Sequence, residues 1–250
     1  MIHVTSALVS VYLSVCQSSC HPVCLSSSIY YILTTFIFYL YLGFCLELGS
    51  LTFGPAAIAA IHNAAPTLFL DVHAVCRPAT TLALLAKLSS AGVSRLILQF
   101  ELFEGTSDFV QVATTARDLG MAVGVCIEPR TSAESLQEVL SAKYRPSHQG
   151  GSGAHNTIDT PLIEMVDVLA VDCGIAGQIF DHEVLEKVVY LCDRYSGSLR
   201  HIAVDGGITD VTAALAAKAG ANLLVAGSFI FKDVYANYHS LVAVLDKHAV

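Results

Sequence analysis

Two strand ends near the carboxyl end of the chain carry the residue types that hold a phosphate and move a proton. Val204-Asp205-Gly206-Gly207-Ile208 is a short apolar strand that runs into a glycine pair, and Val225-Ala226-Gly227-Ser228 repeats this arrangement one strand later. Glycine lets the backbone approach a ligand closely, and the helix that follows offers unpaired N–H groups. We therefore predict that both glycine turns contact one phosphate and that the Asp205 carboxylate lies beside it.

A simpler interpretation of these segments is a pair of turns. Asp-Gly-Gly is an ordinary turn sequence, so one such strand end alone would indicate nothing more. Two of them in tandem, each followed by a helical pattern, favour the phosphate site.

The composition restricts the partners that the chain can have. Of 250 residues 14% are charged, the net charge is −8, and Lys and Arg form no cluster. Because nucleic-acid binding needs grouped Lys and Arg, we predict no nucleic-acid partner. A small anionic ligand held by backbone amides remains compatible with this composition.

The eight cysteines do not indicate a disulfide framework. Cys76, Cys126, Cys173 and Cys192 lie in or beside apolar runs, where a free thiol behaves as a small hydrophobic side chain. We therefore expect a reducing compartment and a cytoplasmic location.

Residues 1–48 differ in kind from the rest of the chain. Met1 to Leu46 contains no Lys, Arg, Asp or Glu, and its apolar run from Ile29 to Leu46 approaches the length of a membrane span. Three interpretations stay open: a membrane anchor through residues 29–46, buried strand material, or a wrongly translated segment. Residues 49–250 are expected to form a single barrel.

From Leu68 onward, short β-branched runs alternate with helical patterns, as in a parallel α/β sheet. The predicted strands are Leu68–Val72, Arg95–Glu101, Ala122–Ile127, Val166–Asp172, His201–Asp205 and Leu223–Ala226. The predicted helices include Thr80–Ala91, Asp108–Leu119 and Val211–Ala219. A TIM (β/α)8 barrel requires eight strands, so the remaining strands would have to come from before Leu51. Residues 142–161, rich in Ser, Gly and His, indicate a flexible surface insertion.

Four segments occur in an order that restricts the families to which the chain can belong. They are Leu51-Thr52-Phe53-Gly54-Pro55, Leu70-Asp71-Val72-His73, Gly174-Ile175-Ala176-Gly177-Gln178-Ile179-Phe180 and Val204-Asp205-Gly206-Gly207-Ile208. This order resembles the ribulose-phosphate 3-epimerase family, over about residues 49–235. Several phosphate-binding barrels share the last segment, whereas the first and third are much more specific.

The resemblance implies a TIM barrel that interconverts D-ribulose 5-phosphate and D-xylulose 5-phosphate, an isomerase of the pentose phosphate pathway that inverts carbon 3. Removing a proton beside a carbonyl creates an enediolate, so the site must stabilise a negative oxygen while an acid and a base exchange the proton. In the family, a divalent metal (zinc, iron or manganese) does the first task and two carboxylates do the second.

Carried over position by position, the resemblance makes His73 a metal ligand and Asp205 both a metal ligand and the general acid or base. The positions around the phosphate are Gly177, Gly206, Gly207, Gly227 and Ser228. Without the resemblance, His73 would be interpreted as a core histidine at a strand end. Asp71, two residues before it, is predicted to face away from the site.

The chain departs from the family pattern at several positions. The place of a His-x-Asp pair on the second strand holds Gly43-Phe44-Cys45-Leu46-Glu47-Leu48. Gln99 replaces a histidine on the fourth strand, although Glu101 keeps the following acid, and Ala176 replaces a glycine of the phosphate loop. We therefore predict weakened metal binding and a very slow epimerase.

The alternative function is a non-catalytic barrel that binds a sugar phosphate or regulates an intact relative. A membrane contact is expected only through residues 29–46. The oligomeric state, a homo-oligomer included, stays open.

Overall fold

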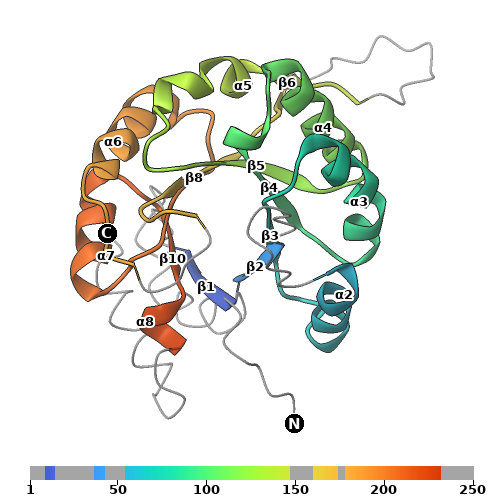
Figure 1. The fold of residues 1–250 in the computed structure, drawn as a ribbon, viewed down its shortest axis with the longest axis horizontal. Helices are drawn as coiled ribbons and strands as arrows, with labels where there is room; N and C mark the ends of the chain where they lie inside the picture. The colour runs from blue at the N-terminus through green and yellow to red at the C-terminus, as the bar shows by residue number, and fades with distance from the viewer. Residues whose placement is uncertain (1–8, 15–36, 43–53, 147–159, 174–177, 232–250) are drawn as a thin grey trace, which may run out of the picture.

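A closed barrel of strands, with helices around its outside, forms the fold (Figure 1). The structure is a computed structural model that describes residues 9–14, 37–42, 54–146, 160–173 and 178–231. The strands are β1 (Val9–Ser14), β2 (Ile37–Leu42), β3 (Leu70–Ala74), β4 (Arg95–Gln99), β5 (Ala122–Ile127), β6 (Lys143–Tyr144), β7 (Thr160–Pro161), β8 (Met165–Leu169), β9 (His201–Asp205) and β10 (Leu223–Ala226). The helices are α2 (Pro55–Ala64), α3 (Pro78–Ser90), η1 (Phe100–Leu102), α4 (Thr106–Asp118), η2 (Ala133–Leu136), α5 (Gln137–Ser141), α6 (Val184–Tyr195), α7 (Asp210–Ala219) and α8 (Ser228–Phe231).

The strand order confirms the predicted α/β barrel and its irregular amino-terminal part. Around the barrel the order is β1-β10-β9-β8-β5-β4-β3-β2. Neighbours from β2 round to β10 are parallel, as the βα alternation predicts, whereas β1 runs antiparallel to both β10 and β2. As expected, the strands that complete the barrel come from before Leu51.

The predicted boundaries differ from the observed ones by up to three residues, at the ends of β3, β4 and β8 and at the ends of α3, α4 and α7. β5, β9 and β10 have the predicted bounds, but β3 begins at Leu70 rather than Leu68. The N–H of Leu68 donates a hydrogen bond to the carbonyl oxygen of Ala65 at 3.1 Å. Leu68 therefore belongs to the turn after α2. β4 ends at Gln99 because the next residues wind into η1, and β8 ends at Leu169, before the predicted Asp172.

The structure describes parts of the apolar amino-terminal segment and of the predicted insertion. Ile37–Leu42 forms β2, as the strand interpretation of the apolar run Ile29–Leu46 requires, and the rest of that run lies outside the described residues. In the part of the chain that the structure describes, no helix has the length and apolarity of a membrane span. β6 and β7 pair in antiparallel fashion at the two ends of the predicted insertion, and residues 147–159 lie outside the description.

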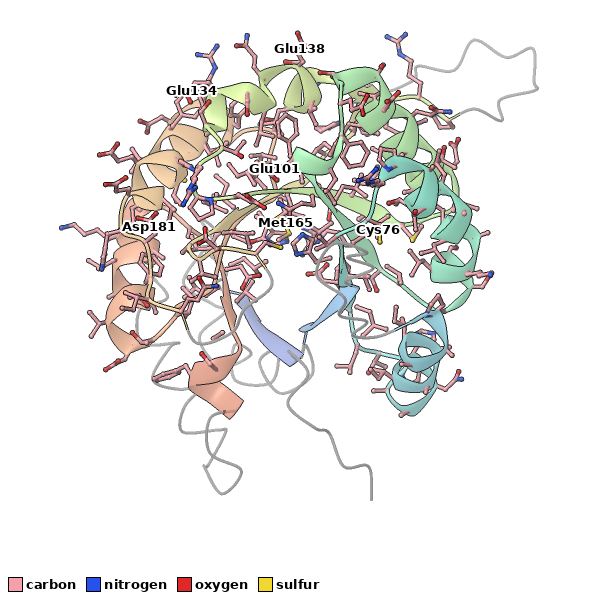
Figure 2. All side chains as sticks on the ribbon, viewed as in Figure 1. Cys76, Glu101, Glu134, Glu138, Met165 and Asp181 are labelled. Atoms are coloured by element: carbon pink, nitrogen blue, oxygen red, sulfur yellow. The ribbon has the colours of Figure 1, made fainter. Side chains whose placement is uncertain are left out.

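The alternation of side chains along the strands divides the apolar core into two layers. One layer lies between strands and helices and includes Leu96, Phe109 and Val123. The other lies inside the barrel and consists of Ile97, Cys126, Met165, Leu169, Ala203, Leu223 and Val225. Figure 2 labels Met165 among the strands at the centre of the ring, whereas Glu134 and Glu138 lie at its outer edge. Every second strand residue therefore faces the interior.

A buried ion pair lies near the amino-terminal ends of β3 and β4. Arg95 Nε and Nη2 donate to the two carboxylate oxygens of Asp71 at 2.8 and 2.6 Å, and both side chains are almost fully buried. The guanidinium also contacts Glu164 at 3.3 Å and stacks over the Phe69 ring at 5.2 Å. The charged side chains inside this end of the barrel therefore neutralise one another.

The prediction that Asp71 faces away from the site was wrong. Strand side chains repeat with a period of two residues, so Asp71 and His73 share the inward face of β3. The two differ in depth, because Asp71 pairs with Arg95 at the first residue of β4, whereas His73 lies further along its strand.

We expect Arg95→Met to lower the free energy of unfolding by about 3 to 5 kcal/mol, because the buried Asp71 carboxylate loses its counter-charge. The double variant Asp71→Leu/Arg95→Met should recover most of this loss, since neither charge is then buried. Urea unfolding of the variants and the parent protein measures both effects. A double variant as unstable as the single one would contradict the assignment.

Candidate functional site

The structure brings both predicted glycine turns to one edge of the barrel. Asp205 is the last residue of β9, and it is the register partner of Val225 on the parallel strand β10. The turns that follow these strands therefore begin side by side, Gly206-Gly207 after β9 and Gly227-Ser228 after β10. Carboxyl ends of parallel strands are where α/β barrels gather ligand-binding groups.

The turn after β9 requires glycine for two reasons. Gly206 and Gly207 have φ angles of +96° and +63°, a backbone region that L side chains rarely adopt. A Cβ at Gly206 would lie 2.3 Å from Val171 Cγ2, and one at Gly207 would lie 2.8 Å from Phe180 Cα. The turn is thus packed against the chain on both sides of residues 174–177. Gly177, the remaining predicted phosphate residue, lies outside the described residues.

A hydrogen-bonded chain fixes the imidazole of His73. His73 is fully buried on β3, and its Nε2 lies 2.7 Å from Gln99 Oε1. The Gln99 amide nitrogen donates to the Glu101 carboxylate. Glu101 in turn accepts from the backbone N–H of Glu128 at 2.8 Å and from the Thr131 hydroxyl. The ring is therefore positioned by contacts that reach the loop after β5.

The same chain determines the tautomer of His73. The Glu101 carboxylate only accepts hydrogen bonds, so the amide nitrogen of Gln99 faces Glu101 and its oxygen faces His73. His73 Nε2 must then carry the proton. In the neutral ring the other nitrogen, Nδ1, keeps its lone pair, and burial lowers the pKa of His73 to about 4, which favours the neutral ring.

His73 belongs to the group of described side chains able to hold a metal ion. The ligand atoms of His73, Cys126 and Asp167 all lie within 4.8 Å of one another, and all three residues are buried. They come from β3, β5 and β8, and Cys126 is the register partner of Asp167. Asp205 is not in this group, so its sharing of one ion with His73 stays a prediction.

Two buried carboxyl groups influence each other across the neighbouring strands β8 and β9. Burial raises the pKa of Asp167 to about 7, although the Cys126 thiol hydrogen-bonds to its carboxylate. Burial and the nearby Asp167 also raise the pKa of Asp205 well above its ordinary value. A carboxyl with a raised pKa can both donate and accept a proton near neutral pH.

Cys126 and Asp167 were missed as site residues by the sequence analysis. Cys126 was interpreted as a small core hydrophobic residue, and it does lie in the inner apolar layer. The signal for Asp167 was available, because it is the one charged residue in the strand Met165–Leu169. A carboxylate in an otherwise apolar strand needs a partner or a function.

Comparison with known proteins identifies related sequences. Residues 156–231 match the model of the Ribulose-phosphate 3 epimerase family. The ribulose-phosphate 3-epimerase of Chlamydia muridarum is 30% identical over 201 residues, 78% of this chain and 76% of its own. That of Rhodobacter capsulatus is 32% identical over 183 residues, 73% of this chain and 68% of its own.

Solved structures show the same fold at lower identity. KGPDC from Streptococcus mutans has a TM-score of 0.59 and 15% identity, with 84% of each chain covered. Orotidine 5'-phosphate decarboxylase from Pyrococcus horikoshii has a TM-score of 0.51 and 16% identity, with 88% of each chain covered. These likenesses concern the barrel alone.

In the metal-free protein, Asp167→Asn should change how stability depends on pH. The folded state binds the Asp167 proton up to about pH 7 and the unfolded state only to about pH 4, so this group loses stabilising effect as the pH rises through that window. The asparagine of the variant binds no proton in this range, so the variant does not lose stability in this way. Its free energy of unfolding relative to the parent should rise by up to about 4 kcal/mol from pH 4 to pH 8.

Denaturant unfolding at several pH values measures this difference. Asp193→Asn, at an exposed position on α6, is the matched control and should follow the parent at every pH. A pH profile of Asp167→Asn that runs parallel to the parent would show that Asp167 does not hold a proton in the folded barrel.

Proposed function

Since the chain belongs to the ribulose-phosphate 3-epimerase family, we propose that it interconverts D-ribulose 5-phosphate and D-xylulose 5-phosphate by proton transfer at carbon 3. The chain is an isomerase by this membership. The observation that carries the proposal is the position of Asp205, whose buried carboxyl ends β9 directly before the paired glycine turns.

We propose that the phosphate of the sugar binds at Gly206, Gly207, Gly227 and Ser228, with Gly177 contributing from the preceding loop. The side-by-side start of the two turns supports this assignment, because backbone N–H groups from both can reach one anion. Tight packing of the Gly206-Gly207 turn against Val171 and Phe180 holds its amides in place before the ligand arrives. Preorganised donors cost little rearrangement on binding.

In this proposal Asp205 moves the proton at carbon 3. Burial and the nearby Asp167 raise the pKa of this carboxyl, which makes its carboxylate a stronger base toward the carbon-3 proton. The phosphate at the neighbouring turns places the sugar chain over the barrel mouth, toward the end of β9. The segment 43–48 lacks the second carboxylate of the family, so in this proposal a water molecule gives a proton to the opposite face of carbon 3, which produces the epimer.

The divalent metal of the family, zinc, iron or manganese, fits the donors around His73. Imidazole, thiol and carboxyl groups converge there within bonding reach of one ion, after small side-chain movements. A bound metal would supply positive charge to a developing enediolate oxygen. The resemblance also gives Asp205 a place on the metal, and its raised pKa supports its second task, proton transfer.

We further propose that turnover is slow compared with intact relatives. Segment 43–48 lacks the His-x-Asp pair that supplies a ligand and the second carboxylate in the family, and Gln99 takes the place of another histidine. Loss of one member of an acid and base pair commonly lowers kcat by about 10²- to 10⁴-fold.

A cytoplasmic location is proposed on the evidence of one relative. The rice protein named ribulose-phosphate 3-epimerase, cytoplasmic isoform, is 30% identical over 183 residues.

Asp205→Asn tests the assignment of the proton-transferring group. The amide keeps the shape of the side chain but cannot exchange the proton, so kcat should fall about 10²- to 10⁴-fold. The Kd for ribulose 5-phosphate should change much less, because the glycine turns are intact. A coupled assay of xylulose 5-phosphate formation and a calorimetric titration measure the two quantities.

Asp210→Asn is the matched control, because this exposed carboxylate begins α7 a few residues beyond Asp205. It should retain the parent's kcat. An Asp205→Asn variant that folds and turns over like the parent would contradict the mechanism. A parent protein that binds the sugar phosphate without converting it would instead indicate the non-catalytic barrel.

A further inference from the structure

The possible metal ligands around His73 differ from those of a site made only of imidazole and carboxylate groups. They include a thiol, and the three side chains come from separate strands that share the barrel interior. We propose that His73, Cys126 and Asp167 form a thiolate-containing zinc site inside the barrel. The inference rests on the proposed function only for the part that the ion plays with a sugar phosphate.

The spacing of the donors suits one small cation. In a tetrahedral zinc site, with bonds of 2.0 to 2.3 Å, neighbouring ligand atoms lie about 3.5 Å apart. The atoms of His73, Cys126 and Asp167 lie within 4.8 Å of one another, so a shift of roughly 1 Å closes the site.

The β5 and β8 register holds two of the donors together. Cys126 and Asp167 are register partners on adjacent parallel strands, and the thiol hydrogen-bonds to the carboxylate. A divalent ion would replace the shared proton between sulfur and oxygen. The thiol proton, together with the carboxyl proton wherever Asp167 holds one, is then released to solvent, and both groups bind the ion as anions.

The hydrogen bonds of His73 already match those of a metal ligand. Metal-bound imidazoles usually donate their other N–H to a carboxyl or carbonyl oxygen, which fixes the ring. Here His73 Nε2–H donates to Gln99 Oε1, and Glu101 holds Gln99 in turn. Nδ1 is therefore the nitrogen that would bind the ion.

The chemistry of the set selects the metal. A thiolate favours zinc over the harder magnesium and manganese ions, and imidazole suits it equally. Three protein ligands leave the fourth position of a tetrahedral ion open, as in catalytic zinc sites. Asp205 lies outside the group of three, so this set holds the ion without the bond that the resemblance assigns to Asp205, whose carboxyl then stays available for proton transfer.

Cobalt(II) is the probe, because it takes the place of zinc and its absorption spectrum reports thiolate ligation. We expect the full-length, chelator-treated protein to bind one cobalt ion per chain, with a sulfur-to-cobalt charge-transfer band in the near ultraviolet. Zinc should displace the cobalt and abolish the band. No sugar phosphate is present in these titrations, so their outcome does not depend on turnover.

Variants assign the ligands. Cys126→Ser should lose the charge-transfer band, whereas Cys192→Ser, which removes a thiol on α6, should keep it. Asp167→Asn should weaken cobalt binding at least about tenfold, and Gln99→Leu about 10- to 100-fold while the band remains. Circular dichroism and urea unfolding of each variant confirm that it is folded.

Two results would overturn the inference: a folded parent protein that shows no thiolate band with cobalt, or a Cys126→Ser variant that retains the band. Epimerase activity without a thiolate band would reject this site and leave the proposed function intact. A thiolate band without epimerase activity would do the reverse. Stoichiometric zinc that raises the Tm of the parent but not of Cys126→Ser would give independent support.

Discussion

A barrel interior admits a polar side chain only where a neighbouring strand supplies its partner, because water cannot solvate it there. The parallel register of β3, β4, β5 and β8 satisfies this constraint in two separate groups. Arg95 and Asp71 neutralise each other near the amino-terminal ends of the strands. Nearer the carboxyl ends, His73 bonds to Gln99, and Cys126 bonds to Asp167.

These two groups differ in charge and in their capacity to bind a ligand. Arg95 donates a separate N–H to each carboxylate oxygen of Asp71. Both groups are therefore already paired and are not expected to bind a ligand. The second group keeps its titratable members neutral through burial, with the pKa of His73 lowered and that of Asp167 raised. A set of neutral donors beside the proposed phosphate-binding edge is suited to accept a cation and a sugar phosphate together.

Local sequence signals predicted the barrel and the strand end that carries Asp205. β5, β9 and β10 have the predicted bounds because apolar runs and glycines delimit them, and Asp205 with its glycine pair was found from its position at a strand end. The antiparallel direction of β1 could not be predicted, since it depends on which strands close the barrel. Cys126 and Asp167 meet only through the β5 and β8 register, which follows a long connection that the sequence does not determine.

The central claim is that a sugar phosphate held at the glycine turns exchanges a carbon-3 proton with a carboxyl group at the end of β9. Incubation of ribulose 5-phosphate with the metal-loaded protein in D₂O, followed by NMR, tests it most directly. The account predicts deuterium at carbon 3 of both ketopentose phosphates, even where net turnover is slow. Folded, metal-loaded protein that leaves carbon 3 unlabelled, or labels carbon 1 alone, would contradict it.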